Sequence, residues 1–553
     1  MLISEQTARI ITEYTSPFNQ LEVNARVTFE GAELLLPAFW RGGGYWSVRM
    51  SVKPGVTYKI HWEAETVEEG LPEPVFENSD TVFITNETVE PHPLTAHGTL
   101  GVSSDGHHFA FEDGTPFFWL GDTWWKGMVG RFSFEEFKEL ADDRKAKNFS
   151  VIQIVAGMLC DEAPYDKTSE NEGGYCWKPD FSEINPVYYD FADRRISYLC
   201  QIGLMPCILF SWGYHITFTG YEKMRLYVRN IVARYAAYPV IWDGCGEIAM
   251  PYYMSKTPDE DRERQRREWT DILDYVRKID PYRRPVGTHP SYSGRREVVR
   301  DDAVDFDMLQ SGHRIEEVAL NAVRQTSVGY HKLPHKPVFV SEAVYEGHMI
   351  VNTDYHQRYV FWTSFLSGAC GFTYGAGGIW QMNTDKTPNG PSAHGGEYER
   401  TPWREAAAFP GSAQLGMSKS FLENYRWYDM KPCQDKITPA AFTFNEDFHE
   451  WFDDRAAFNE GNKNNWCRFY ASGIEDELIM IYLPVGYYDW KTPKVLGLDS
   501  SASYEAKLFN PIDGTVFSKR LLPEGVSEWQ PPCRPLSQDF VLVVEKIGER
   551  NWK

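Results

Sequence analysis

Short apolar runs alternate with helix-like segments between residues 94 and 430, and this alternation constrains the fold more strongly than any other feature of the chain. Because a strand reaches a parallel neighbour only through a long crossover, the pattern predicts a parallel sheet covered by helices. Eight runs qualify as strands: 116–122, 149–155, 206–215 with its loop, 240–247, 285–289, 304–310, 337–342 and 370–375. Eight strand-helix units predict a (β/α)8 barrel, an α/β fold.

The segments between these runs carry helix signals. Ser133 followed by Glu136 forms a capping box ahead of the apolar residues Phe137 and Leu140. Further helices are predicted at about 186–202, 224–235, 269–279, 315–327 and 355–367. The long loop 158–185, rich in acidic and aromatic residues, is expected on the substrate side of the barrel.

Both ends of the chain show the alternation of half-buried strands. It occurs at 21–29, 45–50 and 57–64, and again at 477–483, 506–510 and 540–545. We therefore predict an N-terminal β-sandwich (1–92), the barrel (93–430) and a C-terminal β-sandwich (431–553), with a proline-rich connector around 89–93. We interpret the N-terminal module as a packing domain in preference to a carbohydrate-binding module.

Composition and motifs exclude several functional classes. A formal net charge of −22 argues against nucleic acid or an anionic membrane as a partner, since both need clustered lysine and arginine. The nine cysteines are scattered singly, which fits reduced thiols and offers no zinc framework. No dinucleotide-binding glycine motif follows a strand and no H-E-x-x-H occurs, so neither a metal nor an organic cofactor is expected. The start of the chain has no signal-peptide pattern, so we expect a cytoplasmic protein.

Two of the predicted strands end in a glutamate. The run PVIWDGCGE breaks into glycine and delivers Glu247, and PVFVSE ends in Glu342. All strands of a barrel open at their carboxyl ends onto one face, so we expect the two acids to meet there. Cleavage of a glycosidic bond needs such a pair, because one carboxylic acid protonates the leaving oxygen while the other carboxylate attacks or activates water. The pattern therefore predicts glycoside hydrolysis.

Other residues near the strand ends are weaker candidates. Asp243 and Glu346 lie close to the two glutamates in sequence, and either could replace one of them. Tryptophan can stack on a sugar face and histidine can donate hydrogen bonds to sugar hydroxyls, although each is also common as a core or loop residue. These candidates are Trp124, Trp125, Trp212, Trp380, His215, His289 and His313.

Five motifs together resemble the apiosidase-like glycoside hydrolases, glycoside hydrolase family 140 and its neighbours. They are WLGDTW (119–124), GE (246–247), LQSGH (309–313), SEAVYEG (341–347) and the stretch from FTYGA (372–376) to Trp380. The flanking modules look like the β domains that accompany such barrels, so the resemblance extends over most of the chain.

The resemblance implies roles for individual residues. Glu247 would be the acid/base and Glu342 the nucleophile. One position departs from the family pattern, in which the acid of the fourth strand is an aspartate; Glu247 is one methylene longer, which would suit a different glycone or linkage. The residues that would line the sugar site are Asp122, Gln310, His313 and Tyr345.

These observations lead to one functional expectation with two rivals. We expect a retaining, exo-acting glycoside hydrolase that releases a terminal sugar, such as apiose, arabinofuranose or a related glycone, from small oligosaccharides or plant glycosides. One rival is a catalytically silent carbohydrate-binding protein on a hydrolase scaffold. The other is a barrel lyase or isomerase that uses the acids as proton shuttles. A homo-oligomer is possible.

Overall fold

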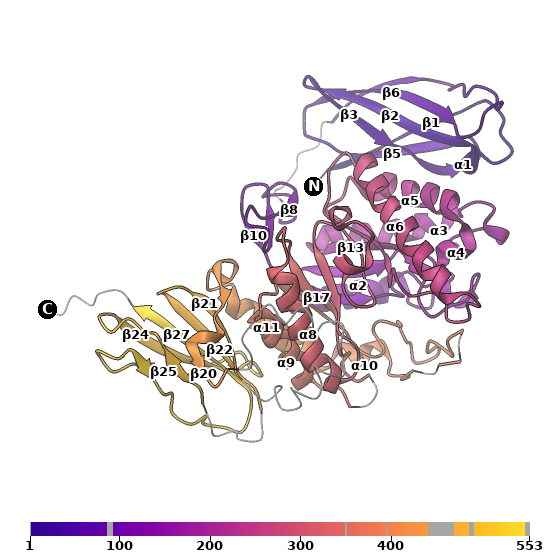
Figure 1. The fold of residues 1–553 in the computed structure, drawn as a ribbon. Helices are drawn as coiled ribbons and strands as arrows, with labels where there is room; N and C mark the ends of the chain where they lie inside the picture. The colour runs from indigo at the N-terminus through magenta and orange to yellow at the C-terminus, as the bar shows by residue number, and fades with distance from the viewer. Residues whose placement is uncertain are drawn as a thin grey trace.

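The computed structural model describes residues 2–85, 92–348, 351–393, 395–396, 398–440, 469–485 and 492–547, except for the side chains of residues 316, 317 and 320. A helix-covered barrel lies between an N-terminal and a C-terminal β module (Figure 1). Most of the predicted connector around 89–93 lies outside the described residues.

Eight parallel strands form the barrel, as predicted. They are β11 (Trp119–Trp124), β12 (Val151–Val155), β13 (Met205–Trp212), β14 (Ile241–Gly246), β15 (Val286–Gly287), β16 (Asp307–Gln310), β17 (Val338–Glu342) and β18 (Gly371–Tyr374). Successive strands are neighbours, and β11 pairs with β18. The Asp305 amide donates to the Val286 carbonyl at 2.7 Å, which brings together the two remaining edges, β15 and β16. This arrangement is a (β/α)8 barrel.

Long helices return the chain from strand to strand. They are α2 (Phe134–Ala146), α3 (Pro186–Ile202), α5 (Tyr221–Tyr235), α6 (Pro258–Ile279), α8 (Ile315–His331) and α9 (Asp354–Phe365). α2 begins with the predicted capping box, in which the Ser133 side chain accepts the Glu136 amide and the Glu136 side chain accepts the Ser133 amide. Between β15 and β16 the chain forms the short α7 (Gly294–Glu297) and a 3-10 helix (Asp301–Ala303), and after β18 come α10 (Trp403–Ala407) and α11 (Pro410–Leu422).

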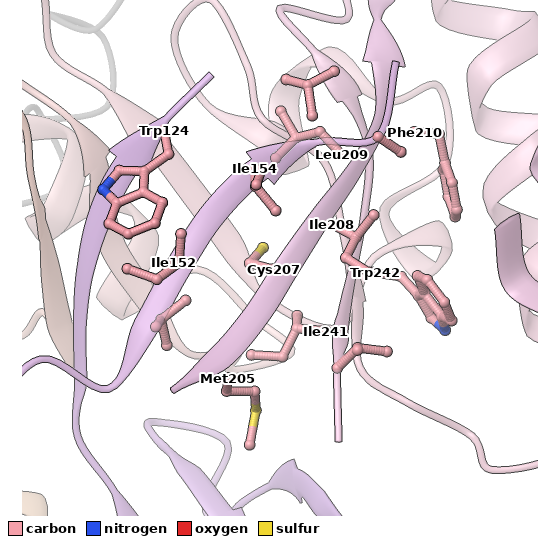
Figure 2. Packing of buried hydrophobic residues seen from close by; sticks show 14 of the residues in the cluster. Trp124, Ile152, Ile154, Met205, Cys207, Ile208, Leu209, Phe210, Ile241 and Trp242 are labelled. Carbon is pink, nitrogen blue, oxygen red and sulfur yellow. The ribbon is translucent and has the colours of Figure 1, made fainter. Parts of the chain in front are cut away.

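The strands β11 to β14 are buried along their whole length, because parallel strands lie between the barrel interior and the helices. Figure 2 shows Ile152 and Ile154 of β12, Cys207 and Ile208 of β13, and Ile241 of β14 among these packed side chains. This burial on both faces of the strands explains why their sequences are continuous apolar runs.

The N-terminal module consists of two antiparallel sheets. One holds β1 (Ile3–Arg9), β5 (Tyr45–Ser51) and β4 (Phe39–Gly42), and the other β3 (Ala32–Pro37), β2 (Leu21–Phe29), β6 (Thr57–Thr66) and β7 (Asp80–Ile84). The module covers α3 and α5 of the barrel (Figure 1). Arg229 of α5 donates to the Val23 carbonyl at 2.9 Å, and Asp193 of α3 binds both Arg49 and Arg234.

A small sheet closes the amino-terminal end of the barrel. It contains β8 (Leu100–Val102), β9 (Phe109–Phe111) and β10 (Pro116–Phe117), so the predicted first strand, 116–122, is divided between β10 and the barrel strand β11. The Phe109 ring lies 5.5 Å from Trp119 and 5.2 Å from Phe306. This apolar plug leaves the opposite, carboxyl-terminal face as the open end of the barrel.

The C-terminal module packs on α9 and α11. Its larger sheet has the order β19 (Lys431–Pro432), β21 (Tyr470–Ile474), β22 (Leu478–Leu483), β27 (Phe540–Ile547), β24 (Ser503–Phe509), β25 (Val516–Leu521), and its smaller one β20 (Ile437–Thr438), β23 (Lys494–Leu496), β26 (Glu528–Trp529). Arg358 of α9 forms a paired contact with Asp539 at 2.8 and 2.9 Å, and Phe421 of α11 stacks on Phe509 at 3.9 Å. Buried contacts of this kind hold the module against the barrel.

Within the described part of the chain, no helix combines the length and the apolar character needed to cross a bilayer.

Candidate active site

Glu247 and Glu342 meet at the open face of the barrel, where β14 and β17 end. Gln310, the last residue of β16, connects them: its Nε2 lies 3.2 Å from Glu247 Oε1 and 3.2 Å from Glu342 Oε1. An amide nitrogen carries two hydrogens, so it can donate one to each acid. A side chain that the sequence analysis placed in the sugar site therefore sits between the two carboxyl groups.

The backbone turns sharply at Glu247. Its φ of 51° lies in the left-handed region, which residues other than glycine rarely adopt and which tends to occur at functional sites. The preceding Gly246 lies under the ring of Trp212, since a Cβ at this position would come within 2.2 Å of Trp212 Cε3. Trp212 Nε1 donates to Glu247 Oε2 at 3.1 Å. The glycine thus admits the indole that holds the acid.

Two effects raise the proton affinity of Glu247. Burial, followed by the negative charge of Glu342, raises the pKa of Glu247 to about 7. The positive charge of His289 and the hydrogen bonds from Gln310 and Trp212 act in the opposite direction without offsetting this rise. A large share of Glu247 therefore carries its proton near neutral pH.

Glu342 has the opposite character. Its residue is 4% exposed, and burial by itself raises the pKa of a carboxyl group. However, His289 Nε2 lies 2.9 Å from Glu342 Oε2 and His313 Nε2 lies 3.1 Å from Oε1. These two imidazoles outweigh the burial and hold the pKa of Glu342 well below its usual range. Glu342 is therefore ionised.

His313 is held with both ring nitrogens toward acceptors. Nδ1 lies 3.2 Å from the Ala343 carbonyl, which can only accept, and Nε2 faces the Glu342 carboxylate. Burial lowers the pKa of His313, but the contact with Glu342 outweighs this and raises it. We infer that His313 is an imidazolium.

His289 has the same arrangement through Ser341. The Ser341 hydroxyl donates to the Leu309 carbonyl at 3.0 Å, so its oxygen accepts from His289 Nδ1 at 3.3 Å. Its other nitrogen, Nε2, faces Glu342, which raises the pKa of His289 against the lowering effect of burial. The contacts with Glu342 thus favour the protonated, positively charged form of both rings.

Aromatic rings from several loops surround the two carboxyl groups. Trp125 Nε1 donates to the Tyr345 hydroxyl at 3.0 Å, and the Trp125 ring lies 4.9 Å from His289 and 5.5 Å from Trp212. The ring of Trp380 lies 6.4 Å from Tyr345. Flat apolar rings next to polar groups are suited to a sugar, which has an apolar face and a hydroxylated rim. Among the described residues there is no cluster of three or more metal-ligating side chains.

A model of the family described as "Apiosidase-like, catalytic domain" matches residues 103–429, more than half of the chain. The chain belongs to the apiosidase-like family. It is therefore a glycoside hydrolase, as the resemblance implied.

Solved structures agree with this apiosidase-like chain in fold. One described as a glycoside hydrolase is 22% identical with a TM-score of 0.62 and covers 84% of this chain and 99% of its own. A family 5 glycoside hydrolase from Bacteroides vulgatus ATCC 8482 is 19% identical with a TM-score of 0.63, covering 85% and 97%. A putative glycoside hydrolase from the same organism is 14% identical with a TM-score of 0.65, covering 99% and 98%. No curated protein matches the chain.

Asp122 and Trp124 lie apart from the carboxyl pair of this apiosidase-like enzyme. Side chains alternate along β11, and these two face the helix α2. Asp122 Oδ2 accepts from Arg144 of α2 at 2.6 Å and from Trp124 Nε1 at 2.8 Å, while the Trp124 ring packs edge-on against Phe137 of α2. Both side chains are fully buried. We therefore leave them out of the proposed sugar site, although the sequence analysis included them.

The two alternative acids are engaged elsewhere. Asp243 is fully buried below the site, where its Oδ1 accepts the His289 amide at 2.7 Å and burial raises its pKa to about 7. Glu346 accepts the Tyr374 hydroxyl at 2.7 Å and the Gly411 amide at 3.0 Å. Glu247 is partly exposed, whereas Asp243 and Glu346 are buried.

His215, a further histidine of the sequence analysis, is fully buried. Its Nε2 lies 2.9 Å from the Leu159 carbonyl, and burial lowers its pKa to about 4. It is a loop histidine with its own partner.

Three residues near Glu247 were not singled out from the sequence. The Tyr398 hydroxyl donates to Asp161 Oδ2 at 3.0 Å, and the Tyr253 hydroxyl is also hydrogen-bonded to Asp161. Burial, the charge of Asp161 and the charge of Glu247 raise the pKa of both tyrosines. The Tyr398 ring lies edge-on against Trp380 at 5.2 Å. The position of Tyr253, six residues after Glu247, was an available signal.

Proposed function

We propose that this glycoside hydrolase is retaining and exo-acting, with Glu342 as the nucleophile and Glu247 as the acid/base. The observation that carries the proposal is the contrast between two carboxyl groups bridged by one amide. Burial and charge raise the pKa of Glu247 to about 7, whereas two imidazoles hold that of Glu342 well below its usual range. Paired acids whose environments push their pKa values apart divide into a proton donor and an ionised partner.

The short separation of the acids supports the retaining mechanism. Because Gln310 Nε2 is 3.2 Å from an oxygen of each glutamate, these two oxygens are no more than about 6.4 Å apart. Retaining enzymes hold their carboxyl groups about 5–5.5 Å apart, whereas inverting enzymes leave about 6.5–9.5 Å for a water molecule. Direct attack by Glu342 therefore suits this spacing better than attack by an interposed water.

In the first step, a Glu342 oxygen attacks the anomeric carbon while the bond to the leaving oxygen breaks. Glu247 donates its proton to that oxygen, so the leaving group departs as a neutral alcohol. The product is an ester between Glu342 and the sugar.

In the second step, the loss of negative charge at Glu342 lowers the pKa of Glu247. The ester carries no negative charge, so the contribution of Glu342 to the raised pKa of Glu247 disappears. Glu247, now ionised, accepts a proton from water as the water attacks the anomeric carbon. Glu342 leaves as a carboxylate, which the imidazolium groups of His289 and His313 stabilise.

We extend the proposal to a terminal apiose, arabinofuranose or related sugar. Membership of the apiosidase-like family supports this glycone class. The burial of Glu342, 4% exposed beside Tyr345, supports exo action, since an enclosed nucleophile accommodates one terminal sugar more readily than an extended chain.

The experiment is hydrolysis of a panel of nitrophenyl glycosides (β-apioside, α-L-arabinofuranoside, β-galactoside, β-glucoside and β-xyloside) by the wild type, Glu342→Ala and Glu247→Ala. We expect turnover of one sugar by the wild type and none by Glu342→Ala. Azide should restore turnover by Glu247→Ala and yield a glycosyl azide, because a small anion can attack the ester without general-base help. The configuration of the first product, read by NMR, should match that of the substrate.

Glu346→Gln is the matched control, and we expect it to keep wild-type turnover per folded molecule. Activity that survives in both Glu247→Ala and Glu342→Ala would overturn the assignment and point to Asp243 or Glu346. Sugar binding without turnover of any substrate would instead favour the catalytically silent alternative. The cytoplasmic location stays part of the proposal and is tested by fractionation of the source cells.

A further inference from the structure

Three loops meet beside Glu247. Asp161 lies in the loop after β12, Tyr253 in the loop after β14 that also carries Glu247, and Tyr398 in the loop after β18. The hydroxyls of Tyr253 and Tyr398 both bind the Asp161 carboxylate. We call this group of Asp161, Tyr253 and Tyr398 the Asp161 clamp.

The backbone holds Asp161 in place as well. Its φ of 55° and that of Met158, 57°, are left-handed, so the chain follows a tight path here. The Ala393 amide donates to the Asp161 carbonyl at 3.3 Å, which ties the same two loops together a second time. These backbone contacts therefore fix the position of the clamp at the mouth of the site.

The clamp lies at the mouth of the site, and one of its tyrosines is on the loop that carries Glu247. Tyr253 shares the loop after β14 with Glu247, and the Tyr398 ring lies edge-on against Trp380 at 5.2 Å, so the clamp borders the site. The charge of Glu247 also acts on both clamp tyrosines. The acid of a retaining glycosidase protonates the oxygen that joins the sugar to its leaving group. A group held on the loop of the acid is therefore placed to meet the leaving group.

The chemistry of the clamp is that of a hydrogen-bond acceptor. A carboxylate has about four acceptor positions, so with two tyrosine hydroxyls bound Asp161 can still accept from a ligand. The three clamp residues are all partly exposed, so a leaving group in the mouth of the site can reach them. Sugar hydroxyls donate to such a carboxylate, while an acidic sugar would meet a like charge.

We propose, on the basis of the function proposed above, that Asp161 is a specificity-determining residue that selects a neutral, hydroxyl-bearing sugar as the leaving group. Recognition consists of a hydrogen bond from a leaving-group hydroxyl to the Asp161 carboxylate. The clamp tyrosines hold that carboxylate in position.

The test compares three substrates with the same glycone, the one identified by the nitrophenyl panel. They are the nitrophenyl glycoside, a disaccharide with a neutral sugar in the leaving position, and a disaccharide with a uronic acid there. Asp161→Asn keeps the shape of the side chain and removes its charge. It should lower kcat/KM for the neutral disaccharide by roughly 10- to 100-fold, as for loss of a hydrogen bond to a charged group.

The same variant should change kcat/KM for the nitrophenyl glycoside by less than about 3-fold, because that leaving group carries no hydroxyl. It should also narrow the preference for the neutral over the uronic disaccharide. Tyr398→Phe, which removes one hydroxyl and leaves the ring, should produce a smaller change in the same direction. Asp180→Asn, an exposed position of the same loop that also has a left-handed backbone, is the control and should leave all three substrates unchanged.

Equal losses on the nitrophenyl glycoside and the neutral disaccharide would mean that Asp161 acts only on the structure of the site and would overturn the inference. Unchanged selectivity in Asp161→Asn would overturn it as well. Glu342→Ala, measured alongside, keeps the two hypotheses separate: activity in that variant contradicts the proposed function, whereas its inactivity together with an unselective Asp161→Asn contradicts this inference alone.

Discussion

The indole nitrogen of Trp212 donates a 3.1 Å hydrogen bond to Oε2 of Glu247. A ring that the sequence suggested as a stacking surface for sugar therefore also holds the proposed proton donor. The same ring covers Gly246, so the position of the acid depends on how closely β13 and β14 approach each other at their carboxyl ends.

Gly246→Ala should displace the acid. The new Cβ would lie 2.2 Å from Trp212 Cε3, so either the ring or the backbone must move. We expect kcat/KM to fall by at least about 10-fold, because a misplaced acid no longer reaches the leaving oxygen. Overpacking should also lower the free energy of unfolding by about 1–3 kcal/mol. Steady-state kinetics and thermal unfolding measure the two effects.

Gly101→Ala is the matched control, since the nearest atom to its Cβ would be 3.9 Å away. A Gly246→Ala enzyme with the kinetics of Gly101→Ala would show that the close contact with Trp212 is not needed to position the acid.

The pH dependence of kcat/KM should be asymmetric. Glu247 must be protonated in the first step, so activity is present below its pKa of about 7 and is lost as the pH rises through that value. Glu342 must be ionised, and its low pKa keeps it so well into the acid range. With a dinitrophenyl glycoside as the substrate, the basic limb of the profile should disappear, because this leaving group needs no proton. If this limb persists unchanged, another group must set it.

His313→Asn should move the acid limb of the same profile. Loss of the positive charge 3.1 Å from Glu342 Oε1 raises the pKa of that carboxyl, so a larger fraction of it is protonated and inactive at low pH. We expect the acid limb to shift upward by about one pH unit or more while the basic limb moves little. His61→Asn, an exposed position on β6, should leave the profile of the wild type. If the pH profile of His313→Asn coincides with that of the wild type, the positive charge of His313 does not set the acid limb.

Asp122→Asn should lower the stability of the protein and leave sugar binding unchanged. Asp122 pairs with Arg144 in a fully buried contact at 2.6 Å, and removal of Asp122 leaves the buried guanidinium with the partly exposed Asp143 as its remaining carboxylate partner. We expect the free energy of unfolding to fall by about 3–5 kcal/mol, measured by denaturant unfolding, with KM close to that of the wild type. Arg144→Met should cause a similar loss, and the double variant should lose less than the sum of the two. A raised KM at unchanged stability would instead return Asp122 to the sugar site.

Much of the barrel was predictable from local patterns. The capping box at Ser133 and the runs that became β12, β13 and β14 fell where expected, because apolar period and helix caps are properties of short segments. The division of the first run at Phe118 was not predictable, since it depends on the pairing of β10 with β9. The domain limits at 92 and 430 stay predictions.

The candidate site was predictable in its parts and not in its arrangement. Glu247 directly follows one strand and Glu342 ends another, which a sequence can show, and Gln310 lies at the end of a third strand. The single amide that bridges both acids depends on the stagger of three strands. Asp161 and Tyr398 are 237 positions apart, so no local pattern could pair them.

By itself the sequence determined how many strands the barrel has, their order, and that two glutamates stand at strand ends, because these follow from local apolar runs and turns. Only the tertiary structure decided which side chains share the cavity. Asp122 lies near the carboxyl end of β11 and Glu247 directly after β14, yet the pleat of β11 turns Asp122 toward α2 and the left-handed turn after β14 turns Glu247 toward Glu342. The direction of a side chain depends on the register and closure of the whole sheet, and the strand's own residues do not specify it.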